Sequence, residues 1–237
     1  MLLLVNGDSH AAAAEAVNSY AFANDDPSMV LKGRAPHPDN LKVSWGYQLS
    51  IPLKVKVICL AESASSNSRI LRTTKEFINT YPGNEELLII IGWSTWEREE
   101  WLIDDVYYQV NASGVDDIPK SHQLKYKEFV ASVNSRKQTV TNDSHAKIWE
   151  FHTELKKKNI KHVFFNSNND FSRIKNENQK DWGINYIMPY EPNGTYHNWL
   201  IAQGFSTISA NNWHFDQTAH LAWSRYLLKY LLSNNLV

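Results

Sequence analysis

An apolar run at the start of the chain leads into a serine whose surroundings suit a nucleophile. Residues 2–5 are apolar, and Gly7, Asp8 and Ser9 follow closely. A serine hydroxyl becomes a nucleophile when a nearby base takes its proton. If the apolar run is a strand, Ser9 lies at its carboxyl end, where open α/β sheets bind ligands. The same residues also make an ordinary turn and helix cap, so the motif needs support from elsewhere in the chain.

The candidate base stands near the other end of the chain, in the sequence NNWHFDQTAH. This segment holds His214 and His220, and imidazole can take and return a proton near neutral pH. A histidine between Trp213 and Phe215 is also typical of a packed loop. Which histidine serves Ser9 therefore depends on the fold.

The elements that must position these residues follow from apolar runs. Four such runs predict strands, at residues 2–6, 54–60, 87–92 and 162–166. Continuous apolar runs are typical of parallel strands covered by helices on both faces. We therefore expect an α/β fold of three layers (α/β/α, flavodoxin-like) around a parallel sheet of about five strands. The fifth strand is expected at residues 184–188 or 206–209.

Periodic segments predict the helices, at residues 11–23, 68–80, 121–135, 144–158 and 217–233. Asp216 is well placed to cap the last of these. Residues 104–119 and 190–196 are expected to be loops that border the site.

Composition limits the class of protein. The 237 residues are 43% hydrophobic and 21% charged, which predicts one soluble globular domain over residues 1–237. A net charge of -1, with lysines scattered apart from the run at residues 156–158, argues against a nucleic-acid partner. The longest apolar stretch, residues 87–93, is too short to span a membrane, so no membrane partner is expected. Residues 1–5 lack the basic flank of a signal peptide, which predicts a cytoplasmic protein.

Taken in chain order, these blocks resemble the SGNH (GDSL-type) hydrolase superfamily. Its members carry the nucleophilic serine in a Gly-Asp-Ser motif after the first strand, as Gly7, Asp8 and Ser9 stand here. The resemblance implies a serine-dependent ester hydrolase (esterase) that works through an acyl-serine intermediate and needs no cofactor. The spacing of the histidines from carboxylates and from Cys59 predicts no metal site.

The oxyanion-hole blocks of the superfamily are matched in position more than in residue type. The glycine expected after the second strand is replaced by Ala64 or Ser65. After the third strand Gly92 matches, but Ser94 occupies the asparagine position. The resemblance implies an oxyanion hole made by the backbone N–H groups of Ser9 and of Ala64 or Ser65, together with the Ser94 hydroxyl.

The superfamily's Asp-x-x-His block also departs from its pattern. His214 precedes His220 by six residues, a spacing that resembles the superfamily's catalytic histidine and the pair opening its last helix. The resemblance makes His214 the general base. Asn211 then stands where the superfamily has aspartate and is expected to orient the imidazole. Asp216 is the alternative acid.

The substrate is expected to be a small-molecule or glycan ester carrying a short acyl group, such as acetyl. A stretch after the third strand contains Trp93, Trp96, Trp101 and Arg98. Tryptophan stacks on sugar rings and arginine binds carboxylates or sulfates, although a helix start whose tryptophans pack on the sheet is the favoured interpretation. The alternatives to a hydrolase are a non-catalytic binding or structural module and an acyltransferase. The chain also resembles uncharacterised SGNH-like bacteriophage proteins, which would place it in an infected cell or on a virion.

Overall fold

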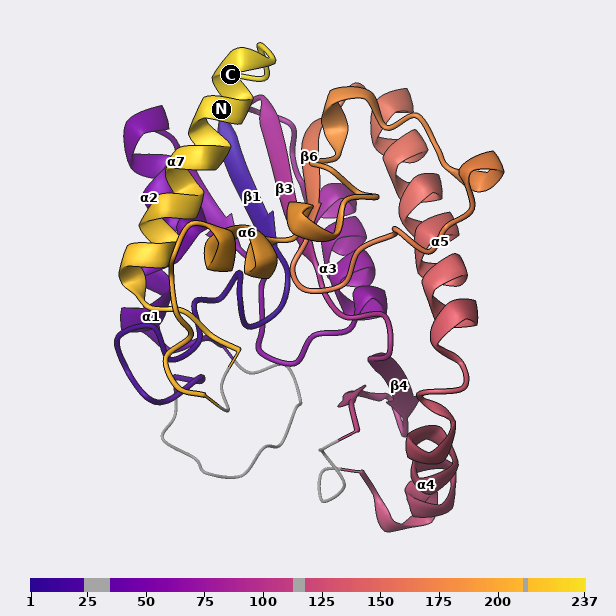
Figure 1. Ribbon diagram of the computed structural model, residues 1–237. Helices are drawn as coiled ribbons and strands as arrows, with labels where there is room; N and C mark the ends of the chain where they lie inside the picture. Colours follow the sequence, from indigo (N-terminus) through magenta and orange to yellow (C-terminus); the bar gives the residue numbers. More distant parts are fainter. Residues whose placement is uncertain (24–34, 113–117, 211–212) are drawn as a thin grey trace.

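The structure is a computed structural model that describes residues 1–23, 35–112, 118–210 and 213–237. Its centre is a four-stranded sheet in the order β2-β1-β3-β6, and every neighbouring pair is parallel (Figure 1). The strands are β1 (Leu2–Asn6), β2 (Lys56–Cys59), β3 (Leu87–Trp93) and β6 (Lys161–Asn166). The predicted α/β fold with a central parallel sheet is confirmed.

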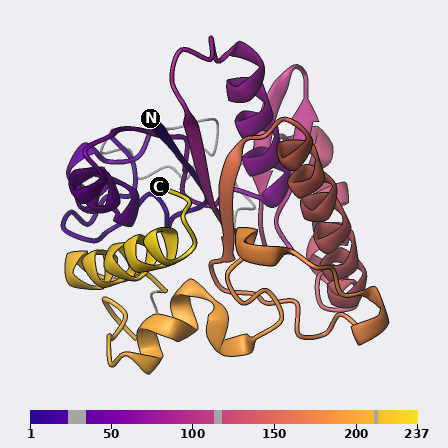
Figure 2. The same cartoon turned by 90° about the horizontal axis from the view of Figure 1, so that it is seen from above.

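The described residues form seven α-helices, some of which cover the two faces of this sheet. They are α1 (Pro38–Val43), α2 (Trp45–Leu53), α3 (Asn67–Thr80), α4 (Gln123–Ser132), α5 (Lys137–Lys157), α6 (Tyr196–Ala202) and α7 (Gln217–Ser233). Short 3₁₀ helices lie at Lys120–His122, Asn176–Asn178, Gly183–Asn185 and Pro192–Gly194. Seen from above, α2 and α7 lie on one side of the sheet while α3 and α5 lie on the other (Figure 2). In the helices of the described ranges, no segment has the length and apolar character needed to cross a membrane.

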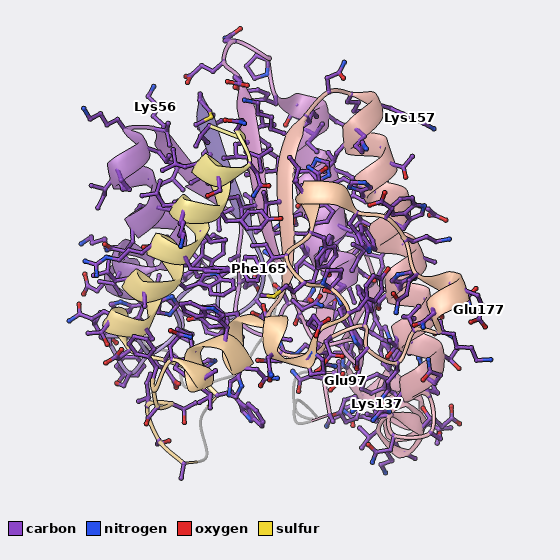
Figure 3. The ribbon with its side chains drawn as sticks, turned by 45° about the horizontal axis from the view of Figure 1, so that its top comes forward. Lys56, Glu97, Lys137, Lys157, Phe165 and Glu177 are labelled. Carbon is purple, nitrogen blue, oxygen red and sulfur yellow. The ribbon has the colours of Figure 1, made fainter. Side chains whose placement is uncertain are left out.

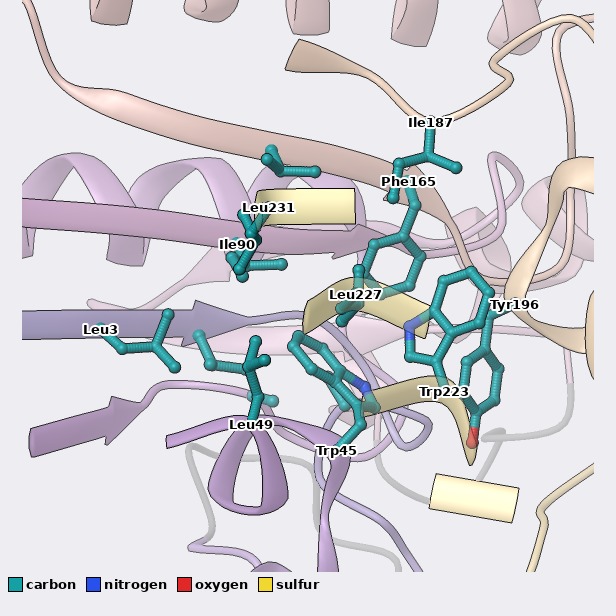
Figure 4. Packing of buried hydrophobic residues seen from close by; sticks show 14 of the residues in the cluster. Leu3, Trp45, Leu49, Ile90, Phe165, Ile187, Tyr196, Trp223, Leu227 and Leu231 are labelled. Carbon is teal, nitrogen blue, oxygen red and sulfur yellow. The ribbon is translucent and has the colours of Figure 1, made fainter. Parts of the chain in front are cut away.

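Alternate residues of the strands belong to two separate hydrophobic cores, one on each face of the sheet. Leu3, Val5, Leu88, Ile90, Val163 and Phe165 face α2 and α7, where they pack with Trp45, Leu49, Trp223 and Leu227 (Figure 4). Leu2, Leu4, Ile89, Ile91 and Phe164 face α3 and α5, where they pack with Ile70, Ile148 and Phe151. In β1, β3 and most of β6 both faces are buried, which is why these strands are largely apolar, whereas the edge strand β2 is more exposed.

The sheet has four strands where about five were expected. In one candidate region, Tyr186 makes a single parallel bridge to Phe164, and the Ile187 N–H donates to the Phe164 carbonyl at 2.8 Å. A 3₁₀ helix directly before this bridge and a left-handed Met188 (φ 40°) directly after it stop the strand from extending. The other candidate also reduces to one bridge, between Thr207 and Phe215.

The predicted loop at residues 104–119 is wrong in its first part. The strands β4 (Glu99–Ile103) and β5 (Val106–Val110) form an antiparallel hairpin. Asp104 and Asp105 form its two-residue turn with φ of 49° and 60°, the left-handed pair that a tight hairpin requires. Aspartate can adopt this left-handed conformation, so the turn forms without a glycine and lacks its most recognisable sequence signal.

The predicted helix at residues 11–23 is also wrong, because these residues form a series of turns. The buried side chain of Asn40 explains the difference. Its Oδ1 accepts from the N–H groups of Val17 and Asn18, and its Nδ2 donates to the carbonyls of Asn18 and Tyr20. A distant amide thus satisfies the backbone groups that a helix would have paired.

The other four predicted helices are present: α7 has the predicted bounds, whereas α3, α4 and α5 have shifted ends. Asp216 caps α7 as expected, since its Oδ1 accepts from the N–H groups of Thr218 and Ala219 at 3.0 Å. The sequence reasoning missed α1, α2 and α6. Ser44 caps α2 and Thr195 caps α6, so capping residues were the available signal.

Two buried histidines, His152 on α5 and His162 on β6, make the stability of the fold depend on pH. His152 Nδ1 and His162 Nε2 lie 2.9 Å apart, and His162 Nδ1 lies 2.8 Å from the Ile160 carbonyl. Burial lowers the pKa of His152 to about 4, with Lys156 adding to the effect and Asp181 opposing it. Burial also lowers the pKa of His162 to about 4, against the opposing hydrogen bond to Ile160.

We expect the melting temperature to fall as the pH drops from about 6.5 towards 4. In this window the unfolded chain takes up protons that the folded pair refuses, so stability is full above the window and is lost as the pH falls through it. Melting curves at several pH values test this. The double variant His152→Gln/His162→Gln should show a flatter pH dependence, whereas His122→Gln should keep the wild-type slope. Equal slopes for all three proteins would contradict the assignment.

Candidate active site

The candidate site lies where the direction of winding changes. From β1 the chain moves to β2 on one side, and it then crosses to β3 on the other side of β1. Ser9 follows β1 and Ser94 follows β3, so both stand at the carboxyl edge beside this switch point. Open α/β sheets bind ligands at such points. The end of β2 joins the same edge, where the Glu62 N–H donates to the Gly7 carbonyl at 3.3 Å.

The Gly7-Asp8-Ser9 turn is held tightly against the sheet. A Cβ at Gly7 would lie 2.6 Å from the Ala11 Cβ and 2.9 Å from the Gly92 carbonyl oxygen, so only glycine fits. Asp8 Oδ1 accepts from the His10 N–H at 3.0 Å, and a turn follows in place of the expected helix. Ser9 therefore lacks a helix dipole, and it is only 5% exposed.

Asp8 is a buried carboxylate with a ready-made cationic partner. Ser94 Oγ donates to Asp8 Oδ2 at 2.8 Å, and Arg98 Nη1 lies 3.4 Å from the same oxygen. Burial alone would raise the pKa of Asp8, but His10, Arg98 and the Ser94 hydrogen bond together hold it below its usual value. Burial lowers the pKa of His10 to about 4, so His10 is neutral at pH 7 and Arg98 supplies the positive charge.

The predicted oxyanion-hole residues lie around this turn. Ser94 is fixed on both sides, because its N–H donates to Asn67 Oδ1 at 2.8 Å and its hydroxyl contacts Asp8 and Arg98. The Ser65 N–H donates to the Glu62 carbonyl at 3.2 Å. Ala64 adopts a left-handed φ of 65°. Among the described residues, no acceptor is recorded for the N–H groups of Ser9 and Ala64.

His214 is paired with an acid that the sequence reasoning missed. His214 Nδ1 lies 2.7 Å from Glu15 Oε2, with side chains 22% and 31% exposed. Glu15 stands in the turns after Ser9 and has a left-handed φ of 64°. The two residues are 199 positions apart, so no local spacing could have signalled the pair.

A cluster of rings joins the first turn to the start of α7. The rings of His10 and His214 lie 5.7 Å apart in a T-shaped arrangement, and Tyr196 lies 5.3 Å from His10. Asn168 Nδ2 lies 3.0 Å from His10 Nε2, which anchors the imidazole to the loop after β6. Burial lowers the pKa of His220 to about 3, and its ring packs on Tyr196. Ser9 and His214 thus come to the same edge of the sheet.

Comparison with known proteins decides the family. The description "Family of unknown function (DUF6071)" matches residues 17–163, more than half of the chain. The chain belongs to DUF6071. No curated protein sequence matches it significantly.

Two solved structures match this DUF6071 chain over most of its length at low identity. One is described as a lipolytic protein of the G-D-S-L family from Desulfitobacterium hafniense DCB-2, with 14% identity, a TM-score of 0.36, and coverage of 97% of this chain and 99% of that one. The other is a carbohydrate esterase whose active site displays divergent catalytic and non-catalytic binding functions. It has 14% identity and a TM-score of 0.43, and the match covers 98% of this chain and 64% of that one.

The sequence offers Asn211 and Asp216 as partners for His214 in this DUF6071 protein, and the structure describes Asp216. Asn211 lies outside the described residues, so its role stays a prediction. Asp216 Oδ1 accepts from the backbone of α7 and from the Thr218 hydroxyl. Its recorded contacts are those of a helix cap, whereas Glu15 contacts the imidazole of His214 directly.

The tryptophan stretch after β3 packs inward. Trp93 and Trp96 belong to the core under α3 and α5, and Trp101 belongs to a smaller core between the hairpin and α4. The expected packing on the sheet is confirmed for Trp93 and Trp96 but is wrong for Trp101. The expected helix start is also wrong, because residues Glu99–Ile103 form β4. Within the described parts of the chain, no group of three or more His, Cys, Asp and Glu side chains could hold a metal ion.

Proposed function

We propose that this protein is a serine-dependent ester hydrolase with Ser9 as nucleophile, His214 as general base and Glu15 as the acid that orients His214. The observation that carries the proposal is the 2.7 Å contact between His214 Nδ1 and Glu15 Oε2 beside the Gly-Asp-Ser turn. A base held by a carboxylate near a serine is the arrangement that activates a hydroxyl. The chain order of the SGNH-like blocks supports Ser9 and His214 in these roles, whereas the role of Glu15 rests on its contact with His214.

The reaction follows from these roles. His214 takes the proton of Ser9 Oγ while Oγ attacks the ester carbonyl, and the resulting tetrahedral oxyanion collapses to an acyl-serine as His214 protonates the leaving alcohol. Water, deprotonated by His214, then attacks the acyl-serine, which releases the carboxylic acid and restores Ser9. Glu15 stabilises the imidazolium that forms in both halves.

The oxyanion in this proposal is held mainly by backbone groups. We assign this role to the N–H groups of Ser9 and Ala64, because the Ser65 N–H already donates within its own turn. The Ser94 hydroxyl remains a proposed donor, but its recorded contacts suit it to holding Asp8 and Arg98 in place.

The proposed substrate is a short acyl ester, such as an acetyl ester, of a small molecule or glycan. The cytoplasmic location and the bacteriophage origin stay predictions from the sequence. An acyltransferase would use the same acyl-serine with an alcohol in place of water, and it is distinguished by analysing products with and without sugar acceptors.

One observation favours the competing class, a non-catalytic binding module. Ser9 is almost wholly covered, which restricts the approach of an ester to its hydroxyl. The Ser94 and Asn211 departures from the superfamily pattern would also suit a fold that has lost its chemistry.

Fluorophosphonate labelling separates the two classes, since only an activated serine attacks phosphorus. We expect the native protein to be labelled, with the adduct mapped to the Ser9 peptide by mass spectrometry. Protein unfolded before labelling, as well as the Ser9→Ala variant, should remain unlabelled. Absence of label on native protein, or label only at another residue, would overturn the hydrolase proposal.

A further inference from the structure

A cavity of about 290 Å³ lies beside the candidate active site, on the side of the sheet covered by α3 and α5. It is bordered by the start of α3, the end of β3, the start of β4 and the first half of α5. Ser9, His214 and Glu15 do not line it. This volume is near the lower end for small-molecule pockets and suits a ligand about the size of one six-membered ring.

The acids of the cavity wall are already neutralised. Glu99 contacts Arg136 at 2.6 Å and accepts from the Trp101 indole N–H. Glu100 binds the guanidinium of Arg72 through both oxygens and also accepts from Gln109. These carboxylates therefore leave little negative charge to repel an anion.

Two cations of the wall keep donors available. Arg98 uses Nη1 for Ser94 and Asp8, and the described residues offer no recorded acceptor to its Nε and Nη2. Its side chain is 22% exposed. Lys147 is exposed and has no recorded ion pair within the described part of the chain. The exposed Asp143, one turn before Lys147, is the remaining acid of the wall.

The rest of the wall is apolar and rigid. Trp93, Trp96 and Ile148 are buried core residues that also line the cavity, and Trp96 stacks on Phe171 with ring centroids 4.6 Å apart. Such a wall accepts the body of a ring, while an arginine edge pairs with a planar carboxylate through two parallel hydrogen bonds.

We propose that this cavity binds a carboxylate-bearing ring, with Arg98 and Lys147 holding the carboxylate, and that it recognises an acidic group on the substrate. The second part rests on the proposed hydrolase function. Arg98 contacts Asp8, the residue before Ser9. A carboxylate bound to Arg98 would therefore belong to an ester substrate that carries an acidic group close to its ester bond, on either the alcohol or the acyl part. An acidic sugar and an aromatic acid share this chemistry, and the experiment below separates them.

The test is calorimetric titration of the intact Ser9→Ala protein, which binds without turnover. Sodium D-glucuronate, sodium benzoate and the neutral D-glucose serve as probes. We expect at least one carboxylate to bind at least about 10-fold more tightly than glucose, because a charge-assisted bidentate pair is stronger than neutral hydrogen bonds. Tighter glucuronate identifies an acidic sugar as the ligand, and tighter benzoate an aromatic acid.

Variants in the same Ser9→Ala background locate the binding. Lys147→Gln should weaken carboxylate binding about 5-fold, and Arg98→Lys, which keeps the charge but loses the planar fork, about 10-fold. Lys157→Gln is the matched control, since Lys157 is an exposed residue at the far end of α5 (Figure 3). Because Arg98 contacts the buried Asp8, Lys147→Gln keeps the test valid if Arg98→Lys fails to fold.

Each outcome bears on a separate claim. Glucose binding as tight as both carboxylates, or binding unchanged by Lys147→Gln and Arg98→Lys, would overturn the cavity assignment. Carboxylate binding in a protein whose native form neither labels nor hydrolyses esters would sustain the cavity and refute the hydrolase. Activity on esters without carboxylate binding would sustain the hydrolase and refute the cavity assignment.

Discussion

Ser9→Ala is expected to lower p-nitrophenyl acetate hydrolysis by on the order of 10⁴-fold or more, to the rate given by binding and backbone donors alone. The physical reason is that the acyl-serine cannot form without Oγ, so the two easier steps revert to one direct attack by water. Release of p-nitrophenol at neutral to alkaline pH measures the effect. His214→Ala should produce a loss of similar size, because residues that act as one unit are not additive.

The control for this experiment is Ser233→Ala. Ser233 is the exposed last residue of α7, at the opposite end of that helix from His214. It should keep wild-type kinetics. Equal rates in wild type, Ser9→Ala and His214→Ala would remove the proposed mechanism for this ester, and loss of activity in Ser233→Ala would show that the assay reports folding.

Glu15→Gln is expected to lower kcat by roughly 10²- to 10⁴-fold while changing KM little. The carboxylate fixes the imidazole through the 2.7 Å contact and offsets the charge that appears when His214 takes the proton. An amide keeps the shape but lacks the charge. The effect belongs to the transition state, so it should appear in kcat and kcat/KM alike.

The same experiment decides between the acids offered by sequence and structure. Asn211→Ala should leave kcat within a few fold if Glu15 orients His214, and Glu177→Gln serves as an exposed glutamate control remote from the site (Figure 3). A large loss in Asn211→Ala together with a wild-type rate in Glu15→Gln would reverse the assignment. Melting curves of all variants separate a catalytic loss from unfolding.

The strands of the central sheet could be predicted, unlike the β4–β5 hairpin, because burial on both faces leaves a strong local signal. Leu2–Asn6 and Leu87–Trp93 are buried throughout, so every position is apolar or small apart from the turn-forming ends. The same local information located α3 and α7 with the Asp216 cap. It failed at residues 11–23, because there Asn40, distant in sequence, supplies the backbone hydrogen bonds.

The sequence by itself determined the α/β class, the strand ends and the residue types at those ends. Ser9 and His214 became candidates because one follows the first strand and the other precedes the last helix. Only the tertiary structure decided which side chains meet: Glu15 with His214, Ser94 and Arg98 with Asp8, and Asn168 with His10. The physical reason is that strand and helix signals arise from neighbours within a few residues. Each of these contacts joins groups at least 86 positions apart, and those groups meet only when the parallel strands align their carboxyl ends.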